Sequence, residues 1–202
     1  MFNMGIGEVI FGGLGVGLMG IFFYIIITMF IAGLMIGRTP EFLGKKLGAL
    51  EVVMAAAGVL VSAASVLILS AVALSVPAGL SGLTNQSAHG LSEILYAYFS
   101  GAGNNGSAFA GLNANTPFYN LTIGLIILAG RFATLVPGLV IAGSLAGKRI
   151  VPESSATFPT TGIIFMVMFA SVILIVGSLT FLPVFALGPV LEYLFMQKGL
   201  IF

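Results

Sequence analysis

Long apolar stretches alternate with short polar segments along most of the chain. A helix rises about 1.5 Å per residue, so about 20 apolar residues are enough to cross the hydrocarbon core of a bilayer. The pattern therefore predicts an all-α integral membrane protein whose four transmembrane spans lie at residues 18–36, 52–76, 118–146 and 162–182.

Residues 89–117, between the second and third spans, follow a different pattern, HGLSEILYAYFSGAGNNGSAFAGLNANTP. The first part is mostly apolar for about three helical turns, and the second part is rich in glycine, asparagine and serine without any charge. Irregular backbone at membrane depth is tolerated only where protein or a water-filled cavity surrounds it. The pattern predicts a re-entrant pore loop with a short helix over residues 90–100; a glycine-rich extracellular turn without a ligand is the alternative.

The chemistry of this loop favours a cation. Ser87 is placed to cap the short helix, and Glu93 is expected near its first turn, where the positive end of the helix dipole suits a carboxylate. The opposite end carries about half a negative charge and faces residues 101–107. Gly103 and Gly106 permit backbone conformations that turn carbonyl oxygens inward, as in potassium filters. Because this segment contains no acidic residue, we expect K⁺ before Na⁺, and neither Ca²⁺ nor Mg²⁺.

The composition excludes several other classes of protein. Only 6% of the residues are charged, whereas soluble domains carry about 25%. The net charge of +1 argues against binding to nucleic acid. The chain has one histidine and neither cysteine nor aspartate, so zinc sites, histidine triads and two-metal carboxylate sites lack their ligands. We therefore expect a non-catalytic protein.

The basic loops predict an orientation. With four spans and a pore loop that does not cross, the loops at residues 38–46 and 148–149 fall on the same side of the membrane. Basic residues mark the cytoplasmic side. Both termini and the pore loop are therefore predicted to be extracytoplasmic.

The first residues of the chain are unusually rich in glycine for a membrane helix. Glycine inside a helix costs about 1 kcal/mol relative to alanine. Close helix packing explains only some of these residues. We expect a broken or loosely wound segment at Gly12, Gly13, Gly15 and Gly17.

Two charges, on Glu8 and Arg131, fall within otherwise apolar sequence. A charge at mid-bilayer costs at least about 3 kcal/mol on insertion scales. We hypothesise that the two side chains approach each other below the filter, where Arg131 repels cations from a straight path to the cytoplasm. A static pair that locks two helices is the alternative.

Several blocks resemble the potassium-binding subunit of the Kdp potassium-transporting ATPase. The pore-loop blocks are GLSEILYA from Gly90, NNGSAFAGL from Asn104 and NTPF from Asn115. The others are IAGLMIGRTPEFLGKK from Ile31, GRF from Gly130, AGSL from Ala142, FPT from Phe158 and LGP from Leu187. The family fold is similar to a potassium channel in one chain, with four helix–pore loop–helix repeats.

The resemblance implies a division of the chain and a set of site residues. Residues 1–50 would hold the second helix of a partial third repeat, 51–161 the complete fourth repeat, and 162–202 the last helix and tail. Three pore loops are missing, so we expect a fragment, a split-gene product or a truncated remnant. The implied filter residues are Gly103, Asn104, Asn105, Gly106 and Ser107, with K⁺ held by the carbonyls of Asn104, Asn105 and Gly106. The implied gate and tunnel residues are Glu8, Gly12, Gly13, Gly15, Gly17 and Arg131.

The resemblance also implies partners and a location. K⁺ would pass through an intramembrane tunnel to a P-type ATPase subunit, which hydrolyses ATP. The complex would also contain small accessory subunits and the missing repeats, and would lie in the cell inner membrane. The alternatives are a stand-alone potassium channel or symporter of the same superfamily, and a non-conducting membrane scaffold.

Overall fold

The computed structural model describes residues 1, 3–5, 17–37, 39–152 and 158–199. Its long helices match the four predicted spans in place and in apolar character, which confirms an all-α membrane protein. These helices are α2 (Gly17–Met35), α3 (Ala49–Ser75), α6 (Pro117–Gly147) and α7 (Ile163–Phe185). Shorter elements join them: β1 (Glu41–Phe42), β2 (Lys45–Lys46), α4 (Pro77–Leu80), α5 (Ser87–Ala102), η1 (Ala186–Val190) and α8 (Leu191–Gln197).

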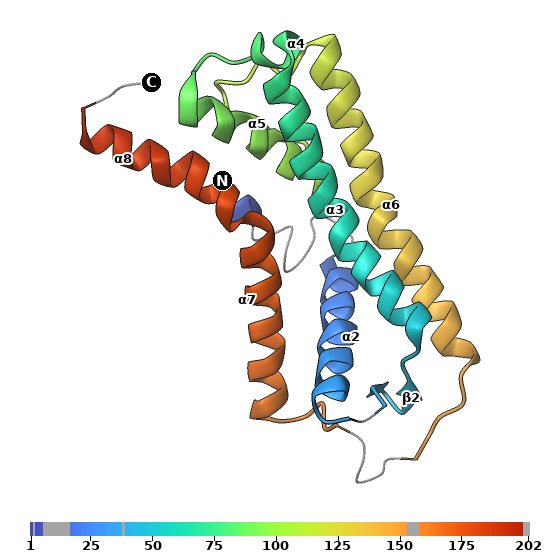
Figure 1. Cartoon of the computed structure of the whole chain (residues 1–202). Coiled ribbons are helices and arrows are strands. Elements are labelled where there is room, and N and C mark those ends of the chain that lie inside the picture. Colours follow the sequence, from blue (N-terminus) through green and yellow to red (C-terminus); the bar gives the residue numbers. More distant parts are fainter. Residues whose placement is uncertain (2, 6–16, 38, 153–157, 200–202) are drawn as a thin grey trace.

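Helices α3 and α6 run side by side as an antiparallel pair, and α6 forms one edge of the molecule (Figure 1). At one end, the Tyr119 hydroxyl donates to the carbonyl of Gly79, 2.8 Å away. At the other end, Lys148 Nζ lies 2.7 Å from Glu51 Oε1. Helix α2 packs closely on α3, because Gly58 has no side chain and the ring of Phe23 occupies that space. The pair thus provides a frame with two distinct ends.

One end of the frame carries the two basic loops. Lys148 Nζ donates to the carbonyl of Lys46 at 2.9 Å, and Lys45 Nζ donates to the carbonyl of Leu145. The described part of the first basic loop, at Lys45 and Lys46, therefore neighbours Lys148, as the parity of the spans predicted. Which side of the membrane this end faces remains a prediction.

The last helix does not stop where the sequence predicted. The fourth span was predicted to end at residue 182, but α7 continues past Pro183 to Phe185 and leads through η1 into α8. A proline removes one backbone hydrogen bond, and helices in membranes tolerate this loss when neighbouring groups compensate. Figure 1 shows α8 turning away from α7 toward α5.

Candidate functional site

Helix α5 and the segment after it leave and return at the same end of the α3–α6 pair. The amide of Thr84 donates to the carbonyl of Gly111 at 3.0 Å, and the amide of Asn113 donates to the carbonyl of Gly82 at 2.8 Å. The segments before and after the loop are therefore bonded to each other. The chain makes a hairpin at this point and does not run through to the basic end.

The hairpin extends about halfway along α6. A Cβ atom on Gly130 would lie 2.2 Å from the carbonyl oxygen of Ala102, the last residue of α5. At about 1.5 Å per residue, Gly130 lies about 20 Å along α6 from Pro117. The end of α5 thus reaches the middle of a helix that is long enough to span a membrane.

Helix α5 is held on several sides. Most of its residues are buried, among them Tyr98, whose hydroxyl donates to Thr122 Oγ1 at 2.9 Å. On another side, the ring of Phe99 packs edge-on against Phe181 of α7, with centroids 4.9 Å apart. This packing fixes the position of the segment that follows the helix.

Residues 103–107 turn their amide groups back toward the end of α5. The amides of Asn105 and Gly106 both donate to the carbonyl of Ser100, at 2.9 and 3.2 Å. The amide of Ser107 donates to Ser100 Oγ at 2.7 Å. Asn104 and Gly106 have φ angles of 61° and 73°, in the left-handed region that such a tight reversal requires.

The carbonyl groups of the same turn are left available. Within the part of the chain that the structure describes, none of the carbonyl oxygens of residues 103–107 accepts a hydrogen bond. Asn105, Gly106 and Ser107 are also exposed. Such oxygens, adjacent to the negative end of a buried helix, are suited to replace the water shell of a monovalent cation.

The structure brings together the five filter residues implied by the resemblance, Gly103, Asn104, Asn105, Gly106 and Ser107, in this one turn. Arg131 directly follows Gly130 and so lies at the depth of the end of α5. Gly17 is the first residue of α2. Glu8, Gly12, Gly13 and Gly15 lie outside the described residues, so the pairing of Glu8 with Arg131 stays a hypothesis.

Two expectations about the start of α5 were wrong. The helix begins at Ser87 itself, which has a φ of 64°, and Gln86 occupies the capping position without a side-chain hydrogen bond. Because the helix starts three residues earlier than predicted, Glu93 lies in its second turn, away from the positive end of the dipole. The Glu93 side chain is instead fully buried and lies against Gly111.

Sequence reasoning also missed Ser100, which is fully buried and organises the turn. Its side chain accepts from the amide of Ser107 and lies 2.8 Å from the hydroxyl of the same residue. The only signal in the sequence is a polar residue at the end of an otherwise apolar stretch, and a serine at that position is equally typical of a solvent-exposed helix end.

We predict that Ser100→Ala loosens the turn, because the Ser107 amide loses its partner at a cost of about 1–3 kcal/mol. Hydrogen exchange of the amides of residues 103–108 should accelerate by about tenfold or more. Ser65→Ala is the control, since Ser65 donates only to Val61 of its own helix. Equal exchange rates in the two variants would contradict this role of Ser100.

Comparisons with known proteins identify the family of the chain. Residues 1–194 match the family described as Potassium-transporting ATPase A subunit, KdpA. The potassium-transporting ATPase potassium-binding subunits of Brucella anthropi and Methylobacterium nodulans are each 53% identical, over 100% and 98% of this chain. The subunit of Acidobacterium capsulatum is 52% identical over 98%. The chain spans about a third of the length of these relatives, 36%, 34% and 34% respectively. The chain belongs to the family of the potassium-transporting ATPase A subunit.

Proposed function

We propose that this chain is part of the potassium-binding and translocating subunit of a high-affinity, ATP-driven potassium uptake complex, and that residues 103–107 supply one quarter of its selectivity filter. The observation that carries the proposal is the difference between the amide and carbonyl groups of this turn. The amides of Asn105, Gly106 and Ser107 are bonded to Ser100, whereas the carbonyls of the turn accept no hydrogen bond from any described residue.

The identity of the ion follows from the chemistry of the turn. Residues 103–107 contain no acidic side chain, so a divalent cation would lack charge compensation. The carbonyls of Asn104, Asn105 and Gly106 would coordinate a dehydrated K⁺, and the end of α5 adds partial negative charge. K⁺ is the transported substrate in this proposal.

A closed ring of carbonyls needs more than one such turn. The relatives are about three times as long as this chain, and the other three pore loops would come from sequence that this chain does not contain. ATP hydrolysis would take place in a partner P-type ATPase subunit, with small accessory subunits completing the complex. The complex would lie in the inner membrane of the cell. The end with Lys45, Lys46 and Lys148 would face the cytoplasm, and the pore loop and both termini would then be extracytoplasmic.

Below the filter, we propose that Arg131 acts with Glu8 and the glycines at 12, 13, 15 and 17 to divert K⁺ sideways toward the partner. The position of Arg131 along α6 supports this role, because its neighbour Gly130 contacts the end of α5, next to the turn at residues 103–107. A guanidinium close to the cation path would oppose direct passage to the cytoplasm.

The proposed function is tested by Gly106→Asp in the assembled complex. Gly106 has a φ of 73°, which side chains rarely adopt, and the added carboxylate would disturb the ring of carbonyls. Saturating K⁺ should stabilise the unmodified complex by about 3 kcal/mol at a hundred times its Kd, and thermal unfolding in K⁺ against choline measures this stabilisation. Gly106→Asp should abolish it.

Gly37→Asp is the matched control, because Gly37 has a φ of 66°, has open space around it and follows α2, away from the turn. It should retain the K⁺ effect. A non-conducting scaffold predicts no K⁺-specific stabilisation of the unmodified complex. A stand-alone channel predicts that this chain, purified without the rest of the subunit, shows the effect by itself.

A further inference from the structure

The segment that returns from residues 103–107 is fastened to one face of α5 at three levels. The hydroxyls of Ser107 and Ser100 lie 2.8 Å apart. The ring of Phe109 stacks on Tyr96, with centroids 4.1 Å apart and planes inclined by 17°. Gly111 lies against the side chain of Glu93, where a Cβ atom would come within 1.9 Å of Oε1.

These three contacts form a ladder between the return segment and α5. Positions 93, 96 and 100 lie on one face of a helix, about 4.5 Å and about 6 Å apart along its axis. Positions 107, 109 and 111 face them with a spacing of two, and the chain turns after Phe109, where the amide of Leu112 donates to the Phe109 carbonyl at 3.0 Å. The three contacts therefore hold the return segment antiparallel to α5 in one register.

Glu93 forms the outermost level and is fully buried. Its Oε1 accepts a hydrogen bond of 2.6 Å from Asn85 Nδ2, and among the described residues its Oε2 has no hydrogen-bond partner. A buried carboxyl group with an unsatisfied oxygen costs stability. Its placement is therefore poorly explained by stability alone, and its contacts indicate what else it does.

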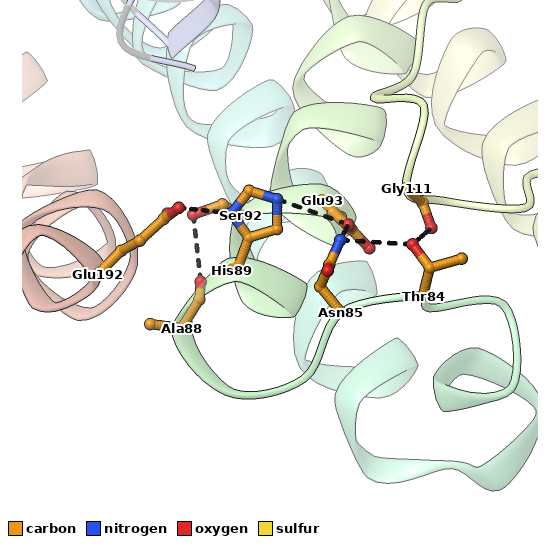
Figure 2. Close-up of polar contacts among 8 residues, drawn as sticks. All are labelled: Thr84, Asn85, Ala88, His89, Ser92, Glu93, Gly111 and Glu192. Atoms are coloured by element: carbon orange, nitrogen blue, oxygen red, sulfur yellow. Dashed lines mark hydrogen bonds and ion pairs between the residues drawn. The ribbon is translucent and has the colours of Figure 1, made fainter. Parts of the chain in front are cut away.

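The contacts of Glu93 join the segments before and after α5 (Figure 2). Asn85, which binds Glu93, precedes α5, and its neighbour Thr84 donates through both its amide and its hydroxyl to the carbonyl of Gly111, at 3.0 and 2.7 Å. Glu93 on α5 thus contacts both the segment before the helix, at Asn85, and the segment after it, at Gly111, and these two segments are also bonded to each other.

His89 contacts Glu93 from the other side (Figure 2). Its Nε2 lies 3.7 Å from Glu93 Oε1, and its Nδ1 lies 2.5 Å from Glu192 Oε1 on α8. The imidazole is held between a carboxylate of the pore-loop helix and a carboxylate of the C-terminal helix. The side chain of Glu93 therefore has a fixed neighbour on the side away from Gly111.

We propose that Glu93 is a positioning residue for the filter: it sets the register of the return segment on α5 and thereby the spacing of the carbonyls in residues 103–107. This inference rests on the proposed function. The turn is fixed at its start by the contact of Ala102 with Gly130 and at its end by the ladder. A change of register at Gly111 is transmitted to the turn, because only three residues, 108–110, separate them.

The experiment compares Glu93→Ala with Glu93→Gln in the assembled complex, using K⁺ and Rb⁺ as probes. The concentration of each ion that gives half-maximal thermal stabilisation is measured, together with the melting temperature without either ion. Glu93→Ala should raise the K⁺ value at least tenfold and change the Rb⁺-to-K⁺ ratio at least threefold. Glu93→Gln keeps an acceptor for Asn85 and similar volume, and should restore the ratio to within twofold of the unmodified complex.

Ser92→Ala is the matched control, since Ser92 is a buried neighbour on α5 whose hydroxyl donates to Ala88 of the same helix. It should leave the ratio unchanged. A Glu93→Ala complex that melts earlier but keeps the ratio would overturn the proposal, because a merely structural role lowers stability without altering the choice between ions.

Asn85→Ala decides the matter if Glu93→Ala fails to assemble. It removes the donor to Glu93 from a partly exposed loop position, and should change the ratio in the same direction. An unchanged ratio overturns the proposal. Absence of any K⁺-specific stabilisation in the unmodified complex would instead overturn the proposed function, so the two failures are distinguishable.

Discussion

Gly130→Ala should lower the K⁺ affinity of the assembled complex by about tenfold to a hundredfold. The added methyl group would lie 2.2 Å from the Ala102 carbonyl oxygen, and that oxygen belongs to backbone that cannot rotate away. Overpacking of this kind costs about 1–3 kcal/mol. Because the end of α5 must move to relieve it, the cost falls on the geometry of the adjacent turn, and each 1.4 kcal/mol corresponds to about tenfold in affinity.

The measurement is the K⁺ concentration that gives half-maximal thermal stabilisation. Gly124→Ala is the control on the same helix: a Cβ atom there meets nothing within 4 Å, and alanine is the better helix former. It should leave the K⁺ affinity unchanged. Equal affinities in the two variants would show that the close contact between α5 and α6 does not set the position of the turn.

The spans could be predicted from the sequence because they depend on one strong signal, the length of the apolar stretches. The hairpin was predictable in outline, since a Gly- and Asn-rich segment between two spans has few other places in a membrane protein, and its entry into the bilayer stays a prediction. The contacts that fix the hairpin were not predictable. Gly130 and Gly124 look alike in the sequence, yet only Gly130 touches another backbone.

The start of α5 shows why the ends of helices were harder to predict than their existence. Ser87 has a φ of 64°, a conformation that serine rarely adopts, and the pattern of polar residues at 84–87 gives no sign of it. An error of one turn changed the interpretation of Glu93 from a residue at the helix dipole to a buried carboxyl group against Gly111. The function of a side chain here depends on long-range contacts, which local propensity does not encode.

The basic end of the molecule illustrates the same limit. In the sequence, Lys148 and Arg149 are adjacent residues that only indicate topology. In the structure, Lys148 pairs at 2.7 Å with Glu51, whose side chain is 1% exposed, whereas Arg149 is exposed. Glu51 also accepts from Ser144 Oγ and from the amide of Gly48. Two adjacent basic residues with the same charge therefore contribute differently to the structure.

We predict that Lys148→Met lowers the free energy of unfolding by about 3 kcal/mol, because it leaves the buried carboxylate of Glu51 without its counter-ion. Thermal or detergent-induced unfolding in native-like lipid measures the change. Arg149→Met is the control, since it removes the same charge from the same loop and should shift stability by less than about 0.5 kcal/mol. Similar losses in both variants would indicate that net charge at this end, and not the pair, stabilises the fold.

The double variant Glu51→Gln with Lys148→Met separates the pair from its surroundings. In Glu51, Oε1 accepts from Ser144 and Oε2 accepts from Gly48. Glutamine keeps one oxygen for the Gly48 amide, its NH₂ group can donate to the Ser144 hydroxyl, and it carries no charge that needs Lys148. If the buried charge causes the loss, the double variant should recover at least half of the stability that Lys148→Met loses, a positive coupling in the cycle. If the losses of the two single variants simply add in the double variant, the loss in Lys148→Met comes from the packing of the lysine side chain. The contact between α3 and α6 at this end would then be stabilised by packing and not by charge.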